Sequence, residues 1–167
     1  MIPIRPITSA LMLVALGACA PKASVSSPST GPSRWTGTFR QSQSATTSVI
    51  GPAAPGKGAA YGTITAVPLP SGTTGNRIEL SISTPLAAGT QIAWAIFSSP
   101  CGSATPPMAG PQEFPTIEVT STGSGFVRAS MPFVLDSHAT YHANVYWSSR
   151  VSDVSNVMMC ANLVESR

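Results

Sequence analysis

The stretch Arg77–Ser83, RIELSIS, alternates apolar and polar side chains at every position. Successive side chains of a β-strand point to opposite faces of the sheet, so this period predicts a strand with Ile78, Leu80 and Ile82 directed toward a core. Similar short runs recur along the chain between clusters of Gly, Pro and Ser, and no segment after residue 33 keeps a helical period. The sequence therefore predicts an all-β domain.

Eight strands are expected, the number typical of a β-sandwich. They are Arg34–Gln41, Ala60–Val67, Arg77–Ser83, Thr90–Ser98, Phe114–Ser121, Phe126–Met131, Thr140–Trp147 and Asn156–Val164. The core is expected to take up the large apolar side chains, among them Trp35, Trp94, Trp147, Met158 and Met159.

An apolar run precedes the strands. Ile7–Ala18 follows Arg5 and is shorter than the roughly 20 residues that span a bilayer, so it fits the apolar part of a signal peptide. LGAC, residues 16–19, resembles the bacterial lipobox, which implies a signal peptide over 1–18 and fatty-acyl chains, palmitate among them, on Cys19. Two or three chains make a stable anchor. The alternative is an ordinary secretory signal in which the cysteine occurs by chance.

Residues 19–33 are rich in Ser, Pro and Ala and are expected to form a flexible tether, ahead of one β-sandwich domain at 34–167. Ala20, rather than Asp, follows Cys19. The lipobox resemblance therefore implies anchoring in the outer membrane, facing the periplasm or the exterior. The expected partners are the membrane, through this anchor, and a protein of the cell envelope.

Charged residues make up only 9% of the chain, against about 25% in typical proteins. The net charge of +3 is spread along the chain without a basic run. This composition predicts no nucleic-acid partner.

The chain has three cysteines. If Cys19 carries lipid, Cys101 and Cys160 remain, and an even pair in an oxidising compartment predicts a disulfide. A bridge that closes a loop of about 60 residues would stabilise the fold by roughly 3–5 kcal/mol. Two free, buried thiols are the alternative.

Two stretches are similar to the copper/zinc superoxide dismutase-like sandwich and to the related domains found in chordin. They are WAIF at 94–97 with Cys101-Gly102, and YHANVY at 141–146 with MCANL at 159–163. The resemblance covers about residues 60–164 and implies an Ig-like or superoxide dismutase-like Greek-key β-sandwich in which these two cysteines are bridged. It also implies a lost metal site, because Ala95, Phe97 and Tyr146 stand where the family has histidines, and residues 99–112 contain none.

The same resemblance places the fourth and seventh strands side by side. Phe97, His142, Asn144 and Tyr146 would then gather on the outer face, where an exposed aromatic patch predicts a contact surface. In the alternative, the loop Ser99–Gln112 folds over this patch and buries it.

No catalytic site, metal or cofactor is expected. His138 and His142 would lie about 13 Å apart on a strand, too far to share one metal, and residues 136–138 (DSH) are expected to form a polar turn rather than a triad. We therefore expect a non-enzymatic, lipid-anchored envelope lipoprotein with a binding or structural role. A divergent superoxide dismutase-like metalloprotein and a small-ligand carrier are the alternatives.

Overall fold

A computed structural model describes residues 33–41, 59–151 and 156–166. The chain is all-β in these ranges, which confirms the expected fold class, and it forms nine strands and one short 3-10 helix, η2 (Pro111–Glu113). The strands are β1 (Arg34–Gln41), β2 (Tyr61–Pro68), β3 (Asn76–Ser83), β4 (Gln91–Ile92), β5 (Trp94–Phe97), β6 (Ile117–Glu118), β7 (Ser124–Met131), β8 (Tyr141–Tyr146) and β9 (Val157–Ser166). The expected signal peptide, Cys19 and nearly all of the expected tether lie outside the described residues.

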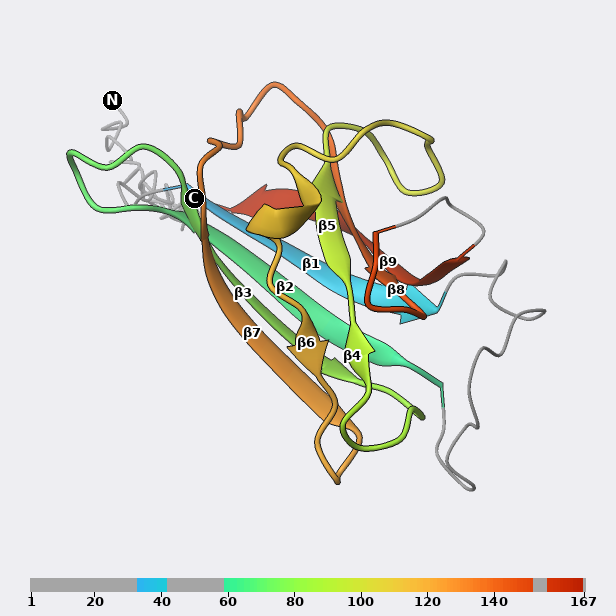
Figure 1. Cartoon of the computed structure of the whole chain (residues 1–167). Helices are drawn as coiled ribbons and strands as arrows, with labels where there is room; N and C mark the ends of the chain where they lie inside the picture. Colours follow the sequence, from blue (N-terminus) through green and yellow to red (C-terminus); the bar gives the residue numbers. More distant parts are fainter. Residues whose placement is uncertain (1–32, 42–58, 152–155, 167) are drawn as a thin grey trace, which may run out of the picture.

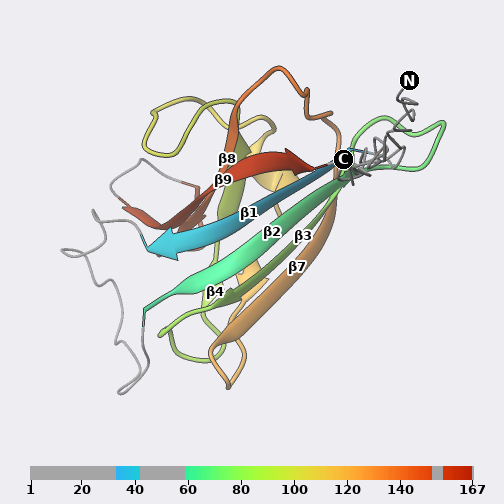
Figure 2. The ribbon, with the colours of Figure 1, turned by 180° about the vertical axis from the view of Figure 1, so that it is seen from behind.

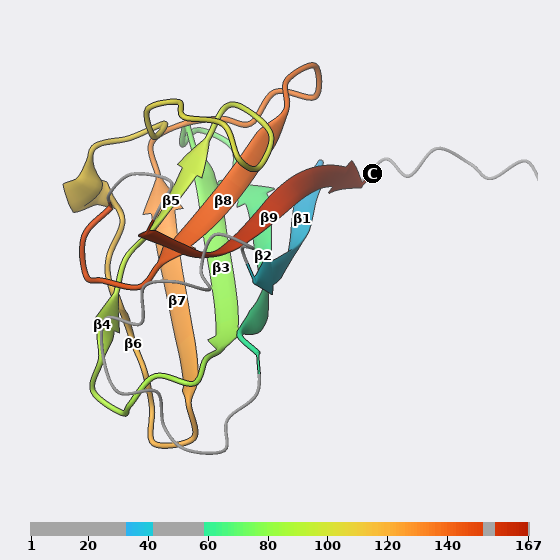
Figure 3. The ribbon, with the colours of Figure 1, turned by 90° about the vertical axis from the view of Figure 1, so that its right-hand side faces the viewer.

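Seven strands form one antiparallel sheet in the order β5-β8-β9-β1-β2-β3-β7, and β4 and β6 form a second, small sheet. The neighbours β3 and β7, and likewise β5 and β8, are not consecutive in the chain, as Greek-key connections require. The large sheet curls, so that β5 lies in front of β1, β2 and β3, and the small sheet of β4 and β6 lies on that same side (Figure 1, Figure 3). The core fills the space between these two layers.

The expected fourth strand is interrupted at Ala93. Its first part, β4, pairs with β6, and its second part, β5, pairs with β8. The N–H of Ala93 donates to the Ser148 carbonyl at 2.7 Å, and the Ala93 carbonyl accepts from the Tyr146 N–H at 2.9 Å. The interruption is therefore a change of partner, and one segment joins the small sheet to the large one.

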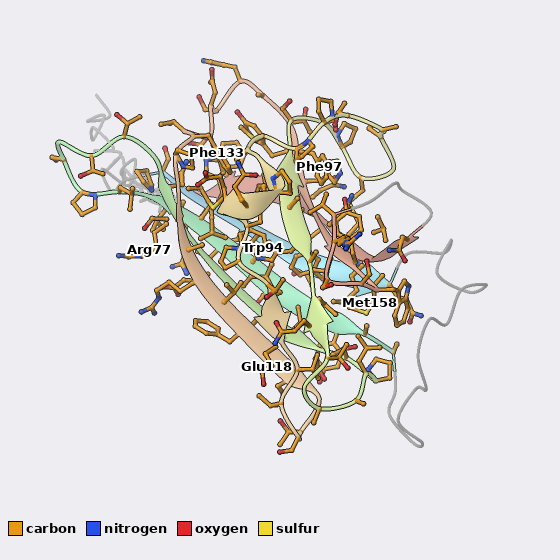
Figure 4. All side chains as sticks on the ribbon, viewed as in Figure 1. Arg77, Trp94, Phe97, Glu118, Phe133 and Met158 are labelled. Atoms are coloured by element: carbon orange, nitrogen blue, oxygen red, sulfur yellow. A yellow bond between two sulfur atoms is a disulfide. The ribbon has the colours of Figure 1, made fainter. Side chains whose placement is uncertain are left out.

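The expected fifth strand is much shorter than its apolar sequence predicts. Only Ile117 and Glu118 pair as β6, while Phe114 leaves the sheet and packs edge-on against Trp94, with 5.0 Å between the ring centroids. The Trp94 indole N–H donates to the Pro115 carbonyl at 2.8 Å. Figure 4 shows Trp94 between β5 and the strands behind it.

The remaining core follows the alternation in the sequence. Ile78, Leu80 and Ile82 are buried, as expected. The three tryptophans and the Met158–Met159 pair are also buried, which confirms the expected core.

Gly75 sets the junction between the β2–β3 turn and the end of β7. Its φ of +132° is in the left-handed region, and a Cβ at this position would overlap the Met131 carbonyl. The next residue, Asn76, is buried, and its side-chain amide donates to the Phe133 carbonyl at 2.7 Å. A glycine is required here because the backbone of β7 leaves no room for a side chain.

We expect Gly75→Ala to lower the free energy of unfolding by about 2–4 kcal/mol, through left-handed strain together with overpacking. Gly72→Ala is the matched control, because Gly72 also has a positive φ but a Cβ added to it would meet no atom within 4 Å. Gly72→Ala should lower the free energy of unfolding by only about 1–2 kcal/mol. Urea unfolding measures both values, and equal losses would contradict the close approach at Gly75.

Candidate functional site

The four residues of the expected contact patch do come together on β5 and β8. Phe97 and His142 are cross-strand partners, and their rings stack with 4.8 Å between centroids and 12° between planes. Asn144 follows His142 two positions on, on the same face of β8, and Tyr146 ends the strand after an irregularity in the pairing with β9.

The patch is buried, however, so the expectation of an exposed contact surface is wrong. Relative exposure is 5% for Phe97, 0% for His142, 4% for Asn144 and 1% for Tyr146. The chain after β5 folds back beside it, because Phe97 forms a β-bridge with Pro107 and the Ile96 carbonyl accepts from the Met108 N–H at 2.8 Å. The alternative, in which the loop after β5 covers the patch, therefore holds at its Phe97–His142 end.

His142 is held as a neutral imidazole. Its Nδ1 lies 2.6 Å from the Ser99 carbonyl oxygen, which can only accept, so Nδ1 carries the proton. Desolvation by burial lowers the pKa of His142, and the hydrogen bond to Ser99 opposes this shift only in part. Nε2 is then a bare acceptor, and neither it nor Asn144 Oδ1 has a hydrogen-bond partner among the residues that the structure describes.

Ser99 was not predicted from the sequence, and nothing in the pattern around it marks it. Its Oγ lies 3.4 Å from His142 Nδ1 and 2.7 Å from Thr105 Oγ1. The imidazole proton is already directed at the Ser99 carbonyl, and Ser99 is itself buried. The pair therefore positions the loop and offers a substrate no nucleophile.

The other histidine lies in a polar turn, as expected. Asp136 Oδ1 accepts from the His138 N–H at 2.8 Å, and the Asp136 carbonyl accepts from the Ala139 N–H at 3.1 Å. Within the described ranges, no three His, Cys, Asp or Glu side chains gather in a way that could hold a metal ion.

Cys101 and Cys160 form the expected disulfide. It joins the loop after β5 to β9, across 59 residues of chain and with 6.0 Å between the Cα atoms. The Cys101 N–H also donates to Asn162 Oδ1 at 2.8 Å. The covering loop is thus fixed at its start to the strand next to β8.

A second surface is open to solvent. The outward side chains of β9, β1, β2, β3 and β7 form one face, called here the outer face, which Figure 2 shows from its solvent side. Strand register aligns its hydroxyl groups, since Thr36 pairs with Thr65 and Thr38 with Thr63. Shallow hollows of about 440 Å³ and 270 Å³ lie on this face. The threonines and serines that line them are Thr36, Thr38, Thr63, Thr65, Ser81, Ser83 and Ser124.

Large apolar side chains also project from the outer face. Tyr61, Phe126 and Val164 are 63%, 58% and 65% exposed. Tyr61 pairs with Ser83, and Phe126 pairs with Ser81, so each ring is adjacent to a hydroxyl on β3. Exposed rings beside polar groups are typical of recognition surfaces.

The outer face also carries an excess of positive charge. Four of the five arginines in the described ranges point from it: Arg34, Arg40, Arg77 and Arg128. Of the five acidic residues in those ranges, only Glu79 does. Glu79 lies 3.0 Å from Arg128 and 3.8 Å from Arg77, as nitrogen–oxygen distances. Figure 4 shows Arg77 projecting away from the sheet.

The chain matches no protein-family model, no curated protein and no solved structure. In the ranges that the structure covers, there is also no helix with the length and apolar content needed to cross a membrane.

Removing the disulfide should weaken the fold. We expect the free energy of unfolding of the double variant Cys101→Ala/Cys160→Ala to be about 3–5 kcal/mol lower than that of the oxidised protein. Without the bridge, the unfolded chain is no longer closed into a loop between two cysteines 59 positions apart. Urea unfolding of the oxidised protein, the reduced protein and the variant measures this. The oxidised protein should change on adding a reductant, while the variant should not, and equal stability of all three would contradict a structural bridge.

Acid should destabilise the fold through His142. Its pKa is lowered in the folded state, so the unfolded chain takes up the proton first. Stability should then be constant above about pH 6.5 and fall below it, by up to about 1.4 kcal/mol per pH unit. The measurement is the slope of the free energy of unfolding against pH, between about pH 7.5 and 5.5.

The variant His142→Phe keeps a ring against Phe97 and should reduce this slope. The control His138→Gln removes an exposed histidine and should keep the slope of the original protein. A slope that follows His138 instead would contradict the assignment.

Proposed function

We propose that this chain is a non-enzymatic, lipid-anchored protein of the cell envelope that binds another envelope component through its outer face. The observation that carries the proposal is the pairing of Cys101 with Cys160. Such bonds persist in oxidising compartments, which supports export. Cys19 is then the one cysteine of the chain left over, and it directly follows the apolar leader.

Binding is favoured over catalysis by where the polar groups lie. The neutral imidazole of His142 is buried beneath the loop after β5, and Ser99, which belongs to that loop, is buried as well. The exposed arginines, hydroxyls and aromatic rings instead gather on one face, as recognition requires. The resemblance to superoxide dismutase-like sandwiches agrees with the pairing of β5 and β8, and the residues at its lost ligand positions, Ala95, Phe97 and Tyr146, are buried.

The divergent metalloprotein is the second candidate. One observation favours it: the unpartnered Nε2 of His142 and Oδ1 of Asn144 are both metal-ligating atoms on one face of β8. Two ligands are fewer than a structural or catalytic zinc site uses. We therefore rank this function below binding.

Intact-mass spectrometry of the chain extracted from membranes tests the anchor. We expect a species that begins at Cys19 and carries fatty-acyl mass, and we expect Cys19→Ser to move the protein into the soluble fraction. The Cys101→Ala/Cys160→Ala variant is the control and should stay acylated and membrane-bound. A full-length, unacylated chain with three free thiols would overturn the proposal.

A further inference from the structure

The outer face indicates the chemistry of its ligand, and this inference rests on the proposed function. We propose that it binds an acidic polysaccharide, a chain of sugar rings that carries carboxylate groups at intervals. The arginines would pair with the carboxylates, the aromatic rings would pack on sugar rings, and the central hydroxyls would bind sugar hydroxyls.

The distribution of charge favours a sparsely charged polymer. Arg34 and Arg40 lie six positions apart on β1, which places their Cα atoms about 20 Å apart. Between them Thr36 and Thr38 project from the same face. Guanidinium groups separated by uncharged hydroxyls match carboxylates separated by uncharged sugar positions, because each arginine fork binds one carboxylate in two places.

The arginines near β3 and β7 add to this pattern. Arg77 and Arg128 share a single acid, Glu79, so this group retains one positive charge in excess. The Arg128 guanidinium also lies 6.0 Å from the Phe126 ring centroid. A cation beside an exposed ring presents a site where a carboxylate and the C–H face of a sugar could bind together.

Three other ligand classes fit this face less well. A protein partner would require an apolar centre to the interface, whereas the centre of this face consists of threonine and serine hydroxyls. A nucleic acid would require denser positive charge than four arginines on three of the five strands of this face. A membrane surface would require apolar side chains gathered along one side, whereas Tyr61 and Val164 project from different strands with Thr36 and Thr63 around them.

Binding of the processed, otherwise complete chain with Cys19→Ser to defined polysaccharides tests the proposal. The probes are polygalacturonate and alginate, which are carboxylated, and dextran, which is neutral. We expect binding to a carboxylated probe, weakening as salt is added, and no binding to dextran.

The variants locate the site. Arg34→Gln and Arg40→Gln should each weaken binding about two- to five-fold, the size of an exposed ion pair. Tyr61→Ser should also weaken it. Arg150→Gln is the matched control, because Arg150 is exposed but lies off this face beside Phe114 and Ala93, and it should leave binding unchanged. Because all four side chains are exposed, unchanged thermal unfolding should show that the variants fold.

Several outcomes would overturn the inference. These are equal binding to dextran, no binding to either carboxylated probe, an equal loss in Arg150→Gln, or stronger binding to anionic phospholipid vesicles or to an oligonucleotide. None of them alters the mass or fractionation of the acylated chain. Failure of this inference would therefore leave the proposal of a lipid-anchored envelope protein unaffected. Absence of acylation would instead overturn that proposal, whatever these probes show.

Discussion

The pairing of β5 with β8 is the constraint that shapes the whole domain. Every residue of both strands is buried, so this pair has a core on each side instead of one face in water. Trp94 fills the inner side, where it packs against Phe114. The outer side needs a separate cover, because a stacked Phe97–His142 pair and an asparagine amide lie there.

That cover explains the loop after β5 and the disulfide. Ordering a loop costs conformational entropy, so a loop outside the sheet stays in place only if its contacts offset that cost. Pro107 bridges to Phe97, the Ser99 carbonyl accepts a hydrogen bond from the His142 Nδ1–H, and Cys101 is bonded to β9. These contacts cover the outer side of the sheet over β5 and β8, and the rest of that side, on β9, β1, β2, β3 and β7, stays open to solvent.

The outer face gathers arginines, hydroxyls and exposed rings because strand pairing brings together residues that lie far apart in the sequence. Arg34 and Arg77 are 43 positions apart in the chain, yet they project from the same side of the same sheet. A chain with 9% charged residues and a net charge of +3 carries a local excess of arginine because most acids of the described ranges lie elsewhere. Composition alone therefore does not reveal this local excess of arginine.

Local sequence pattern was enough to predict most strands and the inward-facing residues, and the count of cysteines left after Cys19 was enough to predict the pair. Alternation is a local property, and it predicted β1 with its observed bounds and the buried set on β3. The outward set on β8 was predicted just as correctly, but its solvent exposure was not, because exposure depends on what else packs there. The folded chain alone reveals that Ala93 separates two pairings and that four arginines share one face, and it alone decides that the loop after β5 covers His142 rather than leaving it exposed. Each of these depends on contacts between segments far apart in the chain, which a local period does not encode.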